Sequence, residues 1–281
     1  MICKTMTLIS LNIGLYLLAT LFLIGTLLRK GPKWCWPLGC ITIVAGLILQ
    51  AYNLSFQLTL GNFDEISAFE ALSLASLIMV LLVLPYLKRH LNTAIIITLF
   101  AAVTQVLSLF DTNDVSFGTP SAWLSIHILT SIVAYAILLL ASIQALLVYF
   151  RDRSLKQKRS IAHRLPPIMR MEHLLFQLLL IGFIMLTISL LTSLAFFDQW
   201  FTAHFIHKTI LTGFAWLLYG AILFARYQFG LRGQAAAKYI LITAVILLLG
   251  ITGTRLIQEF LFTPETTIEI SALSSTIQST S

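Results

Sequence analysis

Long uninterrupted apolar runs constrain the fold of this chain more than any other feature of its sequence. Eight runs can be counted, at about residues 7–28, 36–57, 67–87, 93–109, 122–150, 174–196, 207–225 and 238–260. An apolar stretch of ~18 or more residues with few charges is typical of a helix that spans a membrane. Hydrophobic residues make up 58% of the chain and charged residues only 10%, against about 25% charged in soluble domains. The sequence therefore predicts an all-α, polytopic membrane helix bundle of about eight transmembrane helices, of which the fourth is short and the fifth long.

The basic residues predict which helix ends face the cytoplasm. Fifteen of the 18 Lys and Arg residues fall in alternate loops, after the first, third, fifth and seventh runs. Cytoplasmic loops carry an excess of Lys and Arg. We therefore expect a multi-pass protein of the bacterial cytoplasmic (inner) membrane with both termini on the outer, periplasmic side. The densest basic stretch, Arg151–Arg170, is better explained by attraction to anionic lipid heads than by nucleic-acid binding.

The runs also suggest how the chain is organised. Residues 1–60 are expected to form two N-terminal transmembrane helices, and residues 61–262 a six-helix membrane core. The Ser/Thr-rich stretch 263–281 is expected to be a disordered polar tail. Polar side chains within the runs gather in the outer halves, which predicts an outward-biased polar cavity, because polar groups in hydrocarbon normally face a bundle interior or water. The side chains concerned are Gln50, Asn53, Gln57, Gln105, His127, Thr130, Ser131, Thr192, Ser193, His207 and Arg255.

Two histidines enter this outer region from different helices. His127 lies one or two turns inside the fifth run and His207 opens the seventh, whereas His204 is expected just outside the membrane. Neutral imidazole is a common metal ligand, and two facing imidazoles can hold a haem iron from both sides. A zinc site would usually need four ligands. The alternative is that both histidines cap helices or form ordinary hydrogen bonds.

Two further residues could belong to the same site. Trp123 lies four residues before His127 and shares its helix face, although it could equally be an interface anchor. Arg255 lies 17 residues after Lys238, or ~25 Å along a helix, so it reaches the same edge of the membrane. There it could pair with a haem propionate, or instead extend to lipid heads or pair with Glu259.

Three stretches carry a resemblance to a known family. They are "SAFEALSLASL" (67–77), "SAWLSIHILTSIVAYA" (121–136) and "HKTILTGFAWLLY" (207–219), the last followed by "GLRGQAAA" (230–237). In order and spacing they resemble the cytochrome c assembly family of membrane proteins, the CcsA/CcmC/HemX group, over roughly residues 60–260. The resemblance implies a haem-ligating role for His127 and a possible functional role for Glu70. A carboxylate in the first turn of a helix could also serve only to stabilise that turn.

The chain also departs from the family pattern. The family's Trp-rich haem-presenting loop is reduced to "AFFDQWFTAHF" (195–205), with Trp200 its only tryptophan, and Arg255 and Gln258 lie where a second ligating His is expected. This pattern is similar to the shorter HemX/YpjD-like branch. Covalent haem attachment to a cytochrome is therefore not expected, because the presenting surface is missing.

Together these features predict a haem-binding or haem-handling membrane protein that supports cytochrome c assembly or haem homeostasis. Haem b would be held by His127 and His207, with Arg255 and Trp123 beside it. The expected partners are membrane lipids, haem and other cytochrome c biogenesis or haem-pathway proteins, and no nucleic acid. No residue is assigned a catalytic role. The alternatives are an ion or small-solute transporter using the same polar cavity, and a scaffold that recruits a partner through Arg151–Arg170. The lack of acidic residues at mid-membrane weakens the transporter alternative.

Overall fold

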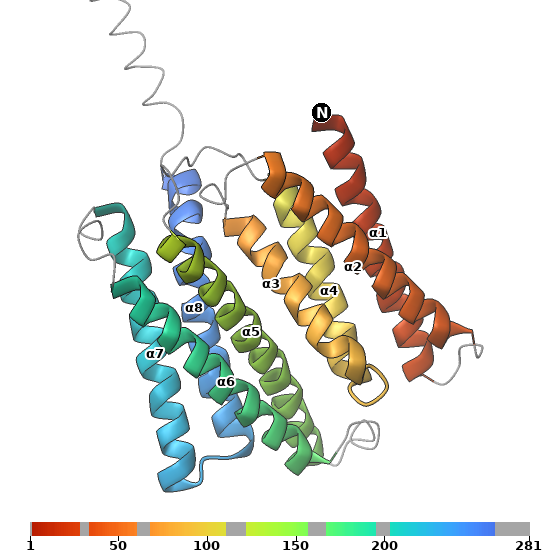
Figure 1. The fold of residues 1–281 in the computed structure, drawn as a ribbon. Coiled ribbons are helices and arrows are strands. Elements are labelled where there is room, and N and C mark those ends of the chain that lie inside the picture. Colours follow the sequence, from red (N-terminus) through yellow and green to blue (C-terminus); the bar gives the residue numbers. More distant parts are fainter. Residues whose placement is uncertain are drawn as a thin grey trace, which may run out of the picture.

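The computed structural model describes residues 2–28, 34–60, 68–110, 122–156, 167–194 and 203–261, and places side chains for residues 6–28, 34–55, 69–109, 126–156, 167–193 and 209–250. These backbone segments form α-helices and short 3-10 turns, without any strand among them, so the predicted all-α bundle is confirmed (Figure 1). The helices are α1 (Ile2–Leu27), α2 (Cys35–Leu60), α3 (Ala68–Val83), α4 (Leu91–Leu107), α5 (Ala122–Lys156), α6 (Ile168–Leu194), α7 (Ala203–Phe229) and α8 (Gly233–Leu261). The stretch 263–281, predicted to be a disordered tail, lies outside the described residues.

The lengths of the helices agree with a multi-pass membrane protein. Seven of the described helices contain a segment long and apolar enough to cross a membrane. The shorter α4 has 17 residues, or ~25 Å, and the 3-10 turn Ser108–Phe110 continues it. Helix α5 is the longest, at 35 residues, and its last turn carries Arg153 and Lys156. This extension past the apolar run places basic side chains beyond the hydrocarbon.

Successive helices alternate in direction, so α3 meets α4 and α7 meets α8 at the same end of the bundle (Figure 1). We call it the basic end, because Lys88, Arg89, Arg226 and Arg232 lie at these turns. The chain begins at the opposite end, which is also where the first turn of α5 lies (Figure 1). Which end faces the cytoplasm remains a prediction, as does the division at residue 60.

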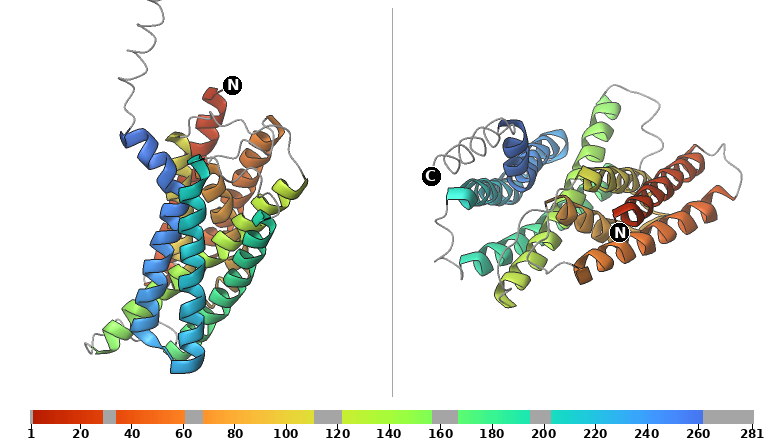
Figure 2. Two further views of the ribbon diagram at one scale, coloured as in Figure 1. Left: turned by 90° about the vertical axis from the view of Figure 1, so that its left-hand side faces the viewer. Right: turned by 90° about the horizontal axis from the view of Figure 1, so that it is seen from above.

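Helix α5 lies between α1–α4 and α6–α8 (Figure 2), and it contributes to a hydrophobic core on each side. One of its faces, with Ala136 and Leu140, packs into a core formed with α1 to α4. Another face, with Ala134 and Leu138, packs into a core formed with α6, α7 and α8. Small residues allow neighbouring helices to approach closely in a membrane, which explains the alanines on both faces. The molecule therefore consists of two helix groups, α1–α4 and α6–α8, joined through α5.

Polar side chains within α1–α4 bond to one another across helices. The Tyr16 hydroxyl donates to Gln50 Oε1 at 2.6 Å. Gln50 Nε2 in turn donates to the Ser73 carbonyl oxygen at 2.9 Å and to Ser76 Oγ at 3.1 Å. Gln105 Nε2 reaches Ser73 Oγ at 2.7 Å. Gln50 and Gln105, expected from the sequence to line an outward cavity, are thus engaged in a buried network of direct hydrogen bonds.

Candidate functional site

His127 lies near the start of α5, where it contacts α6. Its half-buried imidazole places Nδ1 2.9 Å from the Ser189 carbonyl oxygen and 3.3 Å from Thr192 Oγ1. A carbonyl oxygen can only accept a hydrogen bond, so Nδ1 carries the proton and donates it. In this tautomer the Nε2 atom has the lone pair that binds a metal. Histidines that ligate metals almost always donate their other ring N–H to a carbonyl or carboxylate, and His127 has this arrangement.

The sequence alone did not indicate the hydrogen-bond partner on α6. Ser189 is 3% exposed, and its carbonyl oxygen also accepts a hydrogen bond from Thr192 Oγ1 at 2.8 Å. The Thr192 side chain therefore lies where the last turns of α6 face the imidazole. A hydroxyl three residues after a carbonyl commonly bonds back to its own helix, so this contact holds Thr192 in place beside His127.

An aromatic contact joins α6 to α7 about two turns farther into the bundle. The Trp216 ring stacks on Phe183 with ring centroids 5.6 Å apart and an interplanar angle of 13°. Its indole Nε1 donates to Thr187 Oγ1 at 2.9 Å. Trp216 belongs to the third family-like stretch, but its packing role on α6 was not predicted. The contact holds α7 against the same helix that binds His127.

The structure describes only the backbone at three predicted site residues, Trp123, His207 and Arg255, which all lie within helices. The depth of His207 can still be compared with that of His127, because Tyr135 of α5 meets Thr212 of α7. His127 lies ~12 Å along α5 from Tyr135, and His207 lies ~7.5 Å along α7 from Thr212. Both helices run in the same direction (Figure 1). The two histidine positions therefore fall within about one helical turn of each other in depth.

The helical register of α7 shows how well positions 204 and 207 are placed to face the interior of the bundle. Thr212, Ala215 and Tyr219 are buried along one stripe, whereas Ile210 and Phe214 are exposed. At ~100° per residue, position 207 lies at the border between these stripes, and position 204 continues the buried stripe. The backbone therefore makes position 204 at least as well placed as position 207 to face the interior.

Position 255 of α8 can be assigned to a face in the same way. Ala237, Ala244 and Leu247 form the buried stripe of α8, and Ile242 and Leu249 form the exposed one. Position 255 repeats the angular position of Ala237. It therefore belongs to the packed face, near the same end of the bundle as the start of α5.

Glu70 lies in the first turn of α3 and is partly buried. This residue interacts with other groups, so it is not isolated. An acidic group in this position also favours the helix by about 0.3–1 kcal/mol. The described geometry fits this stabilising role, and a function in ligand binding stays a prediction.

The turn between α7 and α8 fixes the position of α8 at the basic end. Gly230 and Gly233 both have φ of 63°, a left-handed conformation that glycine adopts without steric cost. The Gly233 amide donates to Glu172 Oε1 at 2.7 Å, and the Gln234 amide donates to Asp152 Oδ2 at 3.2 Å. Carboxylates from α5 and α6 thus cap the positive end of α8, which explains the Gly-Leu-Arg-Gly motif.

No group of three or more His, Cys, Asp and Glu side chains within the described residues could hold a metal ion. This finding argues against a closed zinc site among them, since such sites need about four protein ligands. A haem iron needs only two axial ligands from the protein. Ligation of an iron by His127 does not depend on such a cluster.

Comparisons with known proteins agree with this architecture. The chain is 26% identical to inner membrane protein YpjD of Escherichia coli strain K12 over 253 residues, which cover 88% of this chain and 95% of that protein. It is 30% identical over 148 residues to an uncharacterized 28.8 kDa protein in the nifR3-like 5′ region of Azospirillum brasilense, covering 51% of this chain and 55% of that one. No solved structure matches the chain. The model of the family described as cytochrome C assembly protein matches residues 34–262, and the chain therefore belongs to the cytochrome c assembly protein family.

Proposed function

We propose that this protein binds haem b in the membrane and supports cytochrome c assembly or haem homeostasis, with His127 as an axial ligand. The observation that carries this proposal is the hydrogen bond from His127 Nδ1 to the Ser189 carbonyl oxygen at 2.9 Å. That bond fixes both the tautomer and the orientation of the ring, and it raises the basicity of the other nitrogen. Family membership supplies the identity of the metal group.

The second ligand is proposed to come from the start of α7. His207 is our first candidate, since it opens the helix at a depth close to that of His127. His204 is its competitor, because the register of α7 favours position 204. When bound, haem would supply an iron that can exchange an electron, or it would be a cargo that the protein passes on to another protein. The protein would hold the ring between α5 and α7, shielded from lipid by α6 and α8.

Arg255 and Trp123 are proposed to bind the periphery of the same group. Position 255 faces the packed side of α8, where a guanidinium could pair with a haem propionate. Trp123 lies one turn before His127 and could contact the porphyrin plane. Glu70 is kept as a possible functional residue. The site would lie on the periplasmic side of the inner membrane, where other cytochrome c biogenesis proteins could reach it.

The haem content of purified variants tests this proposal. We expect wild-type protein from haem-replete cells to carry b-type haem by the pyridine haemochrome assay. His127→Ala should lose most of it, and Arg255→Ala only part, since Arg255 would not touch the iron. Comparison of His204→Ala with His207→Ala identifies the second ligand, because only one of them should lose haem. His173→Ala is the matched control, because His173 is exposed on α6 at the basic end.

Equal haem content in wild type and His127→Ala would contradict the assignment of His127. Wild-type protein without any haem would contradict the proposed function itself. Thermal unfolding of each variant, followed by circular dichroism, separates loss of the ligand from loss of the fold.

A further inference from the structure

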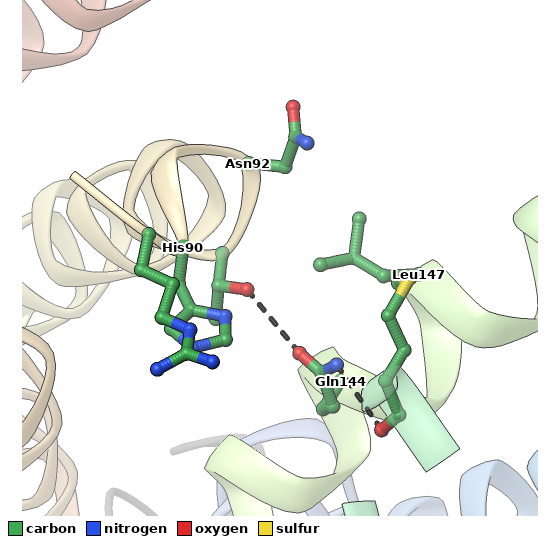
Figure 3. Close-up of a pocket in the computed structure, with 7 residues that line it drawn as sticks. His90, Asn92, Gln144 and Leu147 are labelled. Carbon is green, nitrogen blue, oxygen red and sulfur yellow. Dashed lines mark hydrogen bonds between the residues drawn. The ribbon is translucent and has the colours of Figure 1, made fainter. Parts of the chain in front are cut away.

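A second feature of the molecule lies at the basic end, far from His127. A small cavity of about 20 Å³ opens between α4, α5 and α6. It is lined by Arg89, His90, Asn92, Thr93, Gln144, Leu147 and Met171 (Figure 3). A cavity needs about 10–15 Å³ of such space to hold one water molecule. The cavity is therefore too small for haem, but it admits a water molecule or one part of a small ligand.

Hydrogen bonds between two helices form the inner wall of this cavity. Thr93 Oγ1 donates to Gln144 Oε1 at 3.2 Å, and Gln144 Nε2 reaches the Met171 carbonyl oxygen at 3.4 Å (Figure 3). Gln144 is 1% exposed and Thr93 is 5% exposed. The wall is thus rigid and its polar groups are satisfied, so any ligand must be bound by groups nearer the opening.

The groups near the opening are hydrogen-bond donors. The cavity lies at the start of α4, whose N-cap residue His90 makes no side-chain capping bond. The first amides of a helix have no partner within the helix. Arg89 adds an exposed guanidinium. Burial and the neighbouring Arg89 charge both lower the pKa of His90, in keeping with positively charged surroundings.

Arg151 supplies an independent observation. Its Nε and Nη1 atoms are fully buried, and neither has a hydrogen-bond partner among the described residues. Arg151 follows Leu147 by four positions and Gln144 by seven, so all three share one face of α5. Helical side chains lean toward the N-terminus of their own helix, which directs Arg151 back toward Leu147; Leu147 lines the cavity, whereas Arg151 lies outside its lining. A buried guanidinium without an acceptor is costly.

Within the described part of the chain, the carboxylates closest in sequence to the cavity are engaged elsewhere. The lining contains no acidic residue. Asp152 and Glu172, the acidic residues on the adjoining helix ends, bind the amides at the start of α8, and Asp152 also pairs with Lys156 at 2.9 Å. Among the described residues, therefore, none supplies a counter-charge for Arg151, and a ligand could supply it.

We propose that the basic end binds one phosphate group between α4, α5 and α6, held by Arg151, Arg89 and the first amides of α4. Guanidinium groups bind phosphate oxygens through paired, charge-assisted hydrogen bonds. The site lies where the apolar spans end, so the head group of an anionic phospholipid reaches it directly. A free phosphate-bearing solute offers the same chemistry. This proposal is independent of haem binding.

Native mass spectrometry of the full chain in detergent tests the site with phosphatidylglycerol, phosphatidylcholine and inorganic phosphate as probes. We expect wild-type protein to retain phosphatidylglycerol over phosphatidylcholine. Arg151→Gln should weaken that retention about tenfold or more, because it removes a charged hydrogen-bonding group. Arg153→Gln is the matched control, because Arg153 carries the same charge on the same helix but is exposed. Arg151→Lys should rescue binding only in part, since it lacks the planar pair of donors.

The probes distinguish the two sources of phosphate. Displacement of phosphatidylglycerol by millimolar inorganic phosphate would identify a site for free phosphate, and its failure to displace the lipid would identify a head-group site. If Arg151→Gln does not fold, as judged by thermal unfolding, Arg89→Gln provides the same test, because Arg89 is exposed. Equal phosphatidylglycerol and phosphate binding by the test variant and by Arg153→Gln would overturn the proposal.

Discussion

The two helix groups on either side of α5 differ in how they use buried polar residues. In α1–α4, side chains from four helices meet in one network, in which Gln50 contacts Tyr16, Ser73 and Ser76. In α5–α8, polar contacts between helices lie at different depths, as His127 with Ser189 and Trp216 with Thr187 show. The side chains of this α1–α4 network bond to one another, which suits a scaffold, while the amide of Asn12 and Oδ1 of Asn53 are buried in the same group without a hydrogen-bond partner among the described residues. The second group orients the His127 imidazole through a hydrogen bond at Nδ1, which suits a ligand site.

This difference between α1–α4 and α5–α8 predicts different effects of substitutions on stability and on haem content. Variants in the α1–α4 network should lower stability and leave haem content unchanged. Variants at His127 should remove haem and leave stability nearly unchanged. A variant that changes both properties together would break the distinction between the two groups.

Gln50→Leu should give the largest loss of stability. Gln50 is 2% exposed, and leucine of similar size would leave the Tyr16 hydroxyl without its acceptor and remove the hydrogen bonds from Gln50 to Ser73 and Ser76. Each buried group left unsatisfied costs about 1–3 kcal/mol, although single interhelical bonds in membranes are worth ~0.6 kcal/mol on average. We therefore expect a loss of about 2–3 kcal/mol in the free energy of unfolding. Denaturant titration in mixed micelles, followed by circular dichroism, measures it.

Gln177→Leu is the control for this prediction, because Gln177 is exposed on α6. It should leave stability unchanged or raise it slightly. The same loss in both variants would show that the network does not stabilise α1–α4.

Gly182→Ala should have a smaller effect, at the contact between α5 and α6. A Cβ at this position would lie 2.7 Å from Leu138 Cδ2 and 2.8 Å from its Cγ. Leu138 is fully buried, so it has little freedom to move away. Overpacking of this kind costs about 1–3 kcal/mol, and we expect the lower part of that range because α6 can shift slightly. Thermal unfolding of the purified variant checks it.

Gly213→Ala on α7 serves as the comparison, because a Cβ there would meet no atom within 4 Å. It should be neutral or slightly stabilising, since alanine favours a helix over glycine by up to ~1 kcal/mol. Equal melting temperatures for the two variants would contradict the close approach of α5 and α6.

Much of the fold could be predicted from the sequence because apolar runs and basic loops are local signals. The short α4 and long α5 were both predicted. The arrangement of the helices was not, since spans that are apolar on all sides do not reveal which face meets which neighbour. The placement of α5 between two cores depends on small residues such as Ala136 and Ala141. Alanine is common in any membrane helix, so its presence does not indicate a helix contact. The polar residues of networks such as that of Gln50 were interpreted as the lining of a cavity. The sequence shows that these side chains are polar, but it does not show which of them form hydrogen bonds with one another.

The candidate site was only partly predictable for the same reason. His127 could be selected from its position and its family-like surroundings, but Ser189, which fixes its tautomer through a backbone carbonyl, leaves no signal in the side-chain sequence. Arg151 belonged to a basic stretch interpreted as a solvated, lipid-attracting loop. The burial of its Nε and Nη1 atoms became visible only in the packed structure.

The spin state of the bound iron tests the central claim most directly. Two imidazole ligands give a six-coordinate, low-spin haem, and loss of one leaves the iron five-coordinate or bound to a weak ligand. Low-temperature electron paramagnetic resonance of oxidised, haem-loaded protein should therefore show a low-spin signal in wild type. His127→Ala, reconstituted with haem, should give a high-spin signal. An unchanged low-spin signal in His127→Ala would contradict the assignment of His127 as an axial ligand.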